Sequence, residues 1–255
     1  MNKLTRKQRE IADRHTRFLD IAKSLIETEG YSTLSMDRIA ELAEYSKGTV
    51  YQHFSCKEEI LIQLCNQNGQ ILKSLFERAC DYSGGTREKL LAMGIAHEIW
   101  KAQNPICDEL SQTLHGGGNM DKVSEDSRKL HYELELDILA LVGSVVTAAI
   151  DKGDLDLKQR ATVPELVFGI WSLCHGGLQL RSMDLPLEQM GISAPYRAVM
   201  NTLDATLDGY GWKPSSSEHN YRAASESIFE NLFADELKHL TNNGIAVFNL
   251  SLIHI

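Results

Sequence analysis

The chain has 255 residues, of which 43% are hydrophobic, and its formal net charge is −9. These values predict a globular protein with a buried core and exclude a disordered chain. The apolar runs fall short of the ~20 residues that span a bilayer, and the polar N-terminus lacks the apolar block of a signal peptide. We therefore expect a cytoplasmic protein with no membrane partner.

The charge is distributed unevenly along the chain. Residues 1–23 hold seven Lys or Arg side chains against three acidic ones, whereas the chain after residue 55 is strongly acidic. A basic leading segment on an acidic body suits a protein that presents its N-terminal end to phosphate groups, although such a helix can equally be a solvated face. The five cysteines form no C-x-x-C pair, which favours reduced thiols over a disulfide framework or a zinc ribbon.

Apolar residues recur at helical spacing through almost the whole chain, which predicts an all-α fold. A first helix covers residues 6–28 and ends before a glycine. Ser35 is placed to cap a short second helix, in which Ile39, Leu42 and Ala43 face one way.

The segment from residue 46 to 54 raises a question about its glycine. Ser46 is placed to cap a third helix, and Val50 and Phe54 lie four residues apart on one face of it. This helix has fewer than two turns, yet it carries Gly48, which costs about 1 kcal/mol relative to Ala in a helix. Either Gly48 permits tight packing at a helical corner, or it lets the backbone approach an external partner such as the DNA major groove.

The stretch TLSMDRIAELAEYSKGTVYQHFSCKEEIL, residues 33–61, resembles the DNA-binding domain of the tetracycline-repressor (TetR/AcrR) family of bacterial transcriptional regulators. The resemblance implies an N-terminal three-helix helix-turn-helix domain, joined by a long helix to a C-terminal helical bundle for ligand binding and dimerisation. It also implies a homodimer that binds a palindromic operator in double-stranded DNA, most often as a repressor released by a small-molecule effector. At Glu44-Tyr45 many members carry Gly-Val, so the turn departs from the family pattern.

Carried over position by position, the resemblance implies DNA contacts by residues on and around the third helix. Lys47, Gly48 and Tyr51 are expected near base edges, and their neighbours at phosphates. The expected DNA-binding residues are Ser35, Ser46, Lys47, Gly48, Thr49, Tyr51, Gln52, His53 and Lys57.

Capping and breaking signals predict the remaining helices. Ser55 and Glu58 are spaced as a capping box that begins a long fourth helix, ending near residue 81, and Thr162 and Glu165 repeat the pattern. Three glycines at 116–118 lack the Lys-Ser/Thr of a phosphate loop, so they are interpreted as a hinge or helix terminator. The further helices are expected over 86–103, 105–115, 124–152, 163–184, 195–210 and 219–241.

These elements suggest three segments. We expect a DNA-binding domain over 1–56, an effector-binding and dimerisation domain over 57–241, and a tail over 242–255. The tail ends in LSLIHI, which resembles the translation of a transposon end used in DNA library preparation and would then be foreign to the natural chain. It receives no functional role.

Two helices carry apolar stripes suited to a partner, and the resemblance implies that they form a four-helix bundle across a dimer axis. The same stripes could instead be covered by the chain's own C-terminal helix over 219–241. The expected interface residues are Leu166, Ile170, Leu173, Gly177, Tyr196, Val199, Met200, Leu203 and Leu207.

The resemblance also implies that an effector enters the C-terminal bundle, where a pocket needs apolar walls with a few polar groups. The candidates, each of which could equally be a core residue, are His97, Trp100, His115, Tyr132, Trp171, His175 and Gln179. The acidic body favours a neutral or cationic lipophilic effector over an anion.

Other classes of function have weaker support. No hydrolase, nucleotide-binding or paired-carboxylate motif is present, and the nine His lack a metal-ligand spacing, so we expect no enzyme, cofactor or metal site. One rival is a ligand-binding or adaptor protein of the same fold with no operator. Another is a redox-responsive regulator that senses through Cys56, which stands at a helix N-terminus where thiols are more acidic.

Overall fold

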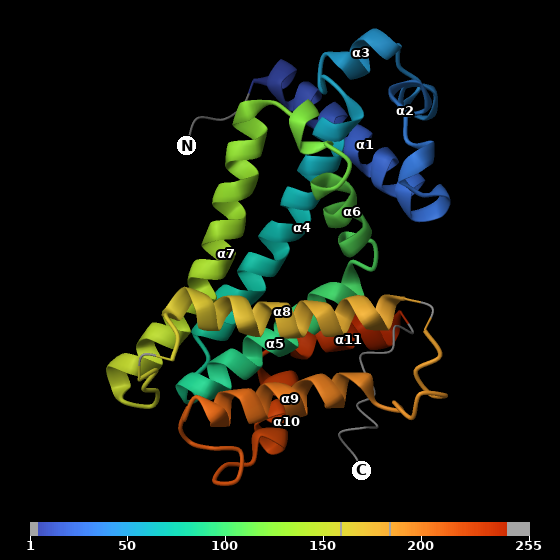
Figure 1. Ribbon diagram of the computed structural model, residues 1–255. Coiled ribbons are helices and arrows are strands. Elements are labelled where there is room, and N and C mark those ends of the chain that lie inside the picture. The colour runs from blue at the N-terminus through green and yellow to red at the C-terminus, as the bar shows by residue number, and fades with distance from the viewer. Residues whose placement is uncertain (1–4, 159, 184, 244–255) are drawn as a thin grey trace. The chain divides into compact units, whose positions relative to one another are not determined.

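The computed structural model describes residues 5–158, 160–183 and 185–243, so that most of the expected tail over 242–255 lies outside the described residues. Within these ranges the regular elements are helices and there is no strand, which confirms the predicted all-α fold (Figure 1). The helices are α1 (Arg6–Glu29), α2 (Met36–Ala43), α3 (Lys47–Tyr51), α4 (Lys57–Cys80), α5 (Thr86–Gln103), α6 (Cys107–His115), α7 (Glu125–Lys152), α8 (Val163–Ser182), α9 (Pro195–Gly209), α10 (Tyr221–Asn231) and α11 (Ala234–Asn242), with short 3-10 turns η1 (Tyr31–Thr33) and η2 (Met120–Lys122).

Packing divides the chain into two units. The first comprises Met1–Gln70 and Ile106–Leu134, and the second Ile71–Pro105 and Glu135–Ile255. The chain passes between the units within α4, again between Pro105 and Ile106 ahead of α6, and a third time within α7. The two units are defined by packing and not by function. The functional boundary expected after residue 56 stays a prediction.

In the first unit, α1 begins with a capping box and its apolar face meets α2 and α3. Thr5 and Gln8 form the capping box, and α1 ends at a glycine with φ of 82°. Phe18, Val50 and Phe54 are at most 2% exposed and belong to one hydrophobic cluster. The prediction that Leu42 faces the same core is wrong, because this side chain is 51% exposed on the outer side of α2.

The turn between α2 and α3 is a Schellman motif that lacks its usual glycine. The Tyr45 N–H bonds the Ala40 carbonyl at 3.0 Å, and the Glu44 N–H bonds the Glu41 carbonyl at 3.1 Å. Glu44 therefore adopts left-handed backbone angles, φ 60° and ψ 39°. This is the position at which the sequence departs from the family pattern, and the turn forms without the glycine.

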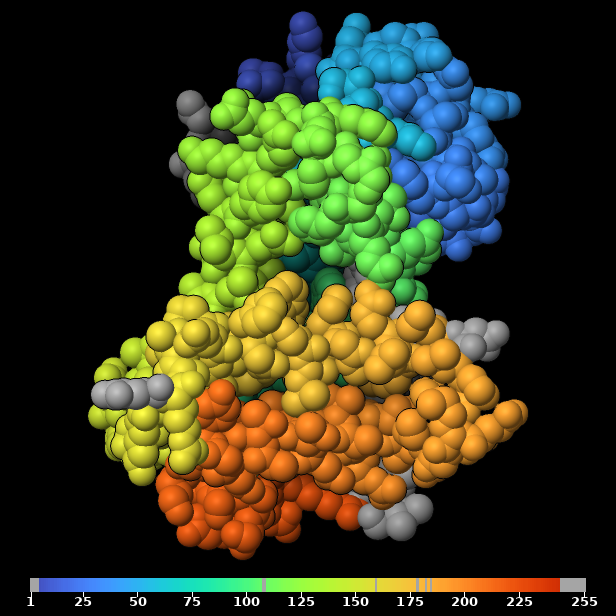
Figure 2. Space-filling model, viewed as in Figure 1, coloured from blue at the N-terminus to red at the C-terminus, as the bar shows by residue number. Residues whose placement is uncertain are grey.

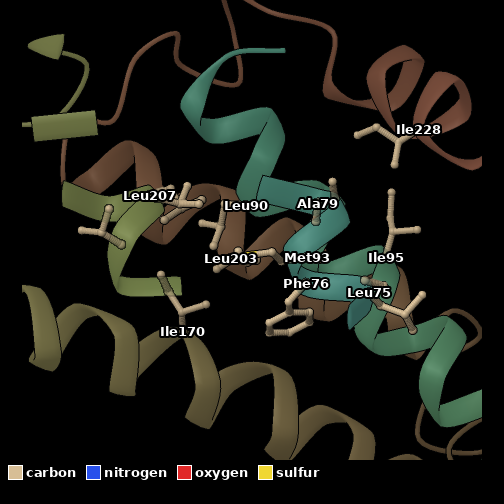
Figure 3. Packing of buried hydrophobic residues seen from close by; sticks show 14 of the residues in the cluster. Leu75, Phe76, Ala79, Leu90, Met93, Ile95, Ile170, Leu203, Leu207 and Ile228 are labelled. Atoms are coloured by element: carbon tan, nitrogen blue, oxygen red, sulfur yellow. The ribbon is translucent and has the colours of Figure 1, made fainter. Parts of the chain in front are cut away.

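In the second unit, α5 lies at the centre of the core. Side chains from α4, α5, α8 and α9 point toward one another, among them Phe76, Met93, Ile170 and Leu203 (Figure 3). The 2% exposed side chain of Arg87 on α5 forms ion pairs with Asp204 at 2.9 Å and Asp208 at 2.5 Å on α9. Burying a charge is tolerated when it is paired and hydrogen-bonded, so these bonds join α5 firmly to α9.

The single helix expected over 219–241 is two helices in the structure. α10 ends at Asn231 and α11 begins at Ala234. Phe233 lies in the break and is fully buried, with the Arg78 guanidinium 5.1 Å from its ring centroid. Helical periodicity alone cannot show such a break, because Phe229 and Phe233 have the i, i+4 spacing of a continuous helix.

We expect Glu44→Gly to raise the free energy of unfolding of the protein by roughly 0.5–1 kcal/mol. The left-handed conformation costs a side chain-bearing residue about 1–2 kcal/mol, and the extra freedom of glycine in the unfolded chain offsets about 0.5–1 kcal/mol of that gain. Urea denaturation measures the difference. Glu41→Gly, one turn earlier within α2, is the control, and it should lower the same free energy by about 1 kcal/mol. Equal destabilisation by both changes would contradict the assigned strain.

Candidate nucleic-acid interface

Helix α3 has only five residues and depends on its cap and on packing. The Ser46 hydroxyl accepts a hydrogen bond from the Thr49 N–H at 3.2 Å and contacts the Thr49 hydroxyl at 2.8 Å. Val50 and Phe54 point inward and are 0% and 2% exposed, as the sequence predicts. A helix this short is not stable in isolation, so these contacts hold it in place.

The outer side of α3 carries exposed polar side chains. Lys47, Tyr51 and Gln52 are exposed, and the Lys47 ammonium lies 5.9 Å from the centroid of the Tyr51 ring. A carboxylate oxygen of Asp37 on α2 lies 2.7 Å from the Lys47 ammonium, and this bond raises the pKa of Lys47. Lys47 is therefore fully charged at neutral pH. The pair is solvent-exposed and hence weak, so a phosphate or base acceptor can replace Asp37.

Gly48 has no packing role among the described residues. A Cβ atom built at this position would meet only the Ser46 hydroxyl oxygen, at an ordinary contact distance of 3.8 Å. Its φ is not in the left-handed region, so the backbone does not require glycine either. Of the two explanations of Gly48, tight packing at a helical corner is therefore wrong.

His53 belongs to an aromatic cluster with α1. Its ring packs edge-to-face on Phe18, with centroids 5.2 Å apart, and its Nδ1 lies 3.4 Å from Nδ1 of His15. His15 in turn donates from Nε2 to the Gln63 amide oxygen at 2.7 Å, so its Nδ1 is the acceptor for the His53 Nδ1–H. Burial, and then the charges of His15 and Arg14, lowers the pKa of His53. Neutral His53 carries no proton on Nε2, so the geometry favours packing over the expected phosphate contact.

The two remaining expected contact residues lie at helix N-termini. Ser35 caps α2 by accepting from the Arg38 N–H at 3.2 Å. Lys57 is the first residue of α4, and its ammonium lies 4.5 Å from the centroid of the Tyr31 ring. Helix N-termini with exposed N–H groups favour anions, so both places suit a phosphate.

Sequence reasoning missed a cationic cluster beside α3. The guanidinium groups of Arg14 and Arg17 lie 5.5 and 5.9 Å from the centroid of the Tyr45 ring, which packs edge-to-face on Phe18. The i, i+3 spacing of the two arginines on α1 indicated a shared face, but nothing in the sequence placed Tyr45 beneath them.

Cys56, the candidate redox sensor, is partly buried. Its thiol donates a hydrogen bond to the backbone carbonyl of Lys122, with a sulfur-to-oxygen distance of 3.5 Å. A redox-sensing cysteine must be accessible to the oxidant, so the partial burial of Cys56 weighs against sensing through it.

The expected effector residues are divided between the two units. His115 and Tyr132 lie in the first, and the other five lie on α5 and α8 in the second. In the second unit the His97 ring stacks on Trp100 with centroids 5.6 Å apart, and the Trp171 ring lies 5.9 Å from that of His175. Burial lowers the pKa of His97 to about 4, with smaller effects from His175 and Lys101, so His97 is neutral at physiological pH.

A small cavity adjoins the His97 ring. Its lining includes His97, Glu98, Arg181 and Tyr196, and Glu98 and Arg181 form an ion pair at 3.2 Å. Its volume of about 20 Å³ suffices for one water molecule. An effector of drug size needs several hundred Å³, so this cavity would have to open to admit one.

The expected dimer-interface residues face mainly inward. Leu166, Ile170, Leu203 and Leu207 are 2–8% exposed and pack in the core of their own unit, which corrects their assignment to an interface. A Cβ on Gly177 would clash with Val199 at 2.4 Å, so this glycine serves the packing of α8 on α9.

The exposed apolar side chains of α8 are different ones. Phe168 is 61% exposed, Trp171 47% and Leu180 54%. Figure 2 shows α8 and α9, yellow to orange, along one face of this unit. Leu173, Tyr196, Val199 and Met200 are partly buried, and the last three of them line the cavity.

Residues 18–64, which include α2 and α3, match the family model described as bacterial regulatory proteins, tetR family. The chain is 26% identical over 176 residues to uncharacterized HTH-type transcriptional regulators of Mycobacterium bovis and Mycobacterium tuberculosis, covering 67% of this chain and 76% of the relatives. No helix in the described ranges is long and apolar enough to cross a membrane.

Solved structures share the fold at low identity. A bacterial regulatory protein in the tetR family from Rhodococcus RHA1 aligns with a TM-score of 0.58 at 18% identity, over 78% of this chain and 97% of that one. The fatty acid degradation regulator FadR from Bacillus halodurans aligns with a TM-score of 0.57 at 17% identity, over 79% and 98%. The match to the family model confirms the resemblance drawn from residues 33–61, and the solved structures confirm the fold.

Proposed function

We propose that this chain, a transcriptional regulator of the TetR family, inserts α3 into the major groove of a palindromic operator, acts as a homodimeric repressor, and is released by a small-molecule effector. The observation that carries the proposal is Gly48. Neither packing nor backbone geometry requires a glycine at this position, and a glycine destabilises a helix as short as α3. We therefore infer that the absence of a side chain serves a contact with a partner outside the chain.

The residues around Gly48 have the chemistry of a groove-reading surface. Lys47 can donate to guanine acceptors and Tyr51 can reach a base edge, because both are exposed beside Gly48. Ser35, Ser46, Thr49, Gln52 and Lys57 lie where hydroxyl, amide, ammonium or helix N-terminal groups can bind phosphates. Arg14 and Arg17 add positive charge on the adjoining face of α1.

A homodimer is supported by the exposed apolar side chains of α8. Phe168 and Trp171 are large, aromatic and one turn apart, with ring centroids 5.9 Å apart. Aromatic side chains are enriched at the centres of protein interfaces, and an isolated pair of this kind on the surface suits a second copy of the same face. Two recognition helices on one palindrome require such a two-fold arrangement.

Effector release is supported by the cavity between α5, α8 and α9. Its lining combines apolar side chains such as Val199 and Met200 with a few polar groups, which is the chemistry of a ligand site, although the cavity is small. Neutral His97 in these surroundings suits a lipophilic ligand without a strong negative charge. An effector that prefers a DNA-incompetent arrangement 100-fold would supply about 2.7 kcal/mol of coupling.

We expect Lys47→Ala and Tyr51→Ala each to weaken operator binding by about 5- to 150-fold, the discrimination that one good base contact supplies. The operator is first identified by sequencing genomic fragments that the parent protein retains, and affinities are then measured by gel shift at several salt concentrations. Lys129→Ala is the control, since Lys129 is 75% exposed on α7 and far along the sequence from α3. Parent-like binding by both α3 variants would refute the groove assignment.

Gly48→Ala separates folding from DNA binding at one residue. The added methyl group makes only an ordinary contact with the Ser46 hydroxyl in the free protein, so the free energy of unfolding should rise by up to about 1 kcal/mol. Operator affinity should fall because the same methyl group projects toward the bases. Denaturation and gel-shift measurements on one preparation test both effects. A variant that gained stability and bound the operator normally would remove the argument drawn from Gly48.

The double variant Phe168→Glu, Trp171→Glu should be monomeric at a concentration where the parent is dimeric, as measured by size-exclusion chromatography with light scattering. Burying two carboxylates against another copy is strongly unfavourable, whereas both positions are exposed in the single chain and tolerate charge. Leu136→Glu, at a 65% exposed position on α7, is the matched control and should leave the dimer intact. A double variant that stayed dimeric would place the interface elsewhere.

A further inference from the structure

We propose that His115, His131 and Glu135 form a binding site for a divalent transition-metal ion, and that zinc is the ion that this ligand set fits best. One ligand atom from each of the three side chains lies within 4.8 Å of the others. The site is separate from α3, and the proposal does not depend on DNA binding. It replaces the expected effector role of His115, and it contradicts the expectation that the chain has no metal site.

The fold brings these residues together across 20 positions of sequence. His131 and Glu135 are four residues apart on the continuous helix α7, so helix geometry alone places them on one face. His115 is the last residue of α6. Gly117 and Gly118 reverse the chain after α6 with φ of 58° and 70°, and the Asn119 amide pins the turn by donating to the Thr113 carbonyl at 2.7 Å. The glycines thus end α6 and turn the chain back, so that α7 passes beside His115.

The distance between the two imidazoles fits a shared metal ion. Their Nε2 atoms lie 3.5 Å apart. Two nitrogens bound tetrahedrally to zinc, each at about 2.0–2.1 Å, are separated by about 3.3 Å. The observed separation is therefore close to that of two ligands on one ion.

A third helix orients His131. The Asn66 amide oxygen on α4 lies 2.6 Å from Nδ1 of His131, so Nδ1 carries the proton and donates it. The neutral tautomer then has its lone pair on Nε2, the atom that faces His115. Metal-binding histidines almost always donate their other N–H to such an acceptor, which sets the ring orientation and the tautomer.

The donor set determines the class of ion. Two imidazoles and one carboxylate are ligands for zinc and its neighbours in the first transition series, whereas magnesium and calcium prefer oxygen alone. Three protein ligands leave a fourth tetrahedral position for water or an exogenous ligand. His131 is buried and His115 is exposed, so the site has one anchored ligand and one side open to solvent for entry of the ion.

The test uses the full-length protein after dialysis against a chelator, with zinc as the probe in a competition titration against a chromophoric chelator. We expect one equivalent of zinc per chain. His115→Ala and Glu135→Gln should each weaken zinc binding by at least tenfold. His239→Ala, at an exposed His near the end of α11, is the control and should bind like the parent. An absence of binding by the parent, or equal binding by all variants, would leave only a pair of hydrogen-bonded histidines and overturn the site.

Substitutions of Asn66 avoid the risk that a change at buried His131 disrupts folding. Asn66→Leu removes the acceptor and should weaken zinc binding by about 10- to 100-fold, whereas Asn66→Asp keeps an acceptor and should restore it. Cobalt in place of zinc identifies the ligands by absorption spectroscopy. Visible bands of a nitrogen and oxygen site without a thiolate charge-transfer band support the assignment, and a thiolate band would place the ion at cysteines instead. Each readout is independent of the operator, so loss of DNA binding does not affect the result.

Discussion

Helix α3 has only five residues and is not stable by itself, so contacts within the first unit must hold its shape. Val50 and Phe54 enter a cluster with Phe18 and His53, and Ser46 satisfies the N-terminal N–H groups. Because packing and capping hold the backbone of α3 from one side, the side chains on its opposite side are not needed to keep the helix folded. Lys47, Gly48 and Tyr51 are exposed on that side, where they are available for the operator contacts proposed above.

The same constraint explains how well the fold and the site could be predicted. The caps at Ser35, Ser46 and Thr162 depend on residues three positions apart, so they can be predicted from the sequence alone. The inward positions of Val50 and Phe54 follow from one helical period in a short segment. Leu42 has the same period but lies on the outer side of α2, since the direction of a stripe is set by neighbours that are distant in sequence.

The residues that sequence reasoning misplaced are those whose environment is created by long-range packing. Leu166 and Leu203 belong to apolar stripes that could line either a core or an interface. Only the packing of α5 and its neighbours shows that these two side chains are internal. His115 and His131 stand 16 residues apart, a separation that matches no metal-binding motif. Their Nε2 atoms meet because a glycine turn joins α6 to α7, and no spacing rule contains that information.

The chain's connectivity limits how an effector could act on the operator. Residues of α4 and of α7 belong to both units, so each of these helices covalently connects the two. An effector that lowers operator affinity must itself be bound more weakly by the operator complex, since the coupling free energy is reciprocal. If the effector binds at the cavity of about 20 Å³ beside Glu98 and Arg181, as proposed, that cavity must open to hold it. The Glu98–Arg181 ion pair must then be kept or replaced by ligand contacts, because a buried charge left without its partner is strongly destabilising.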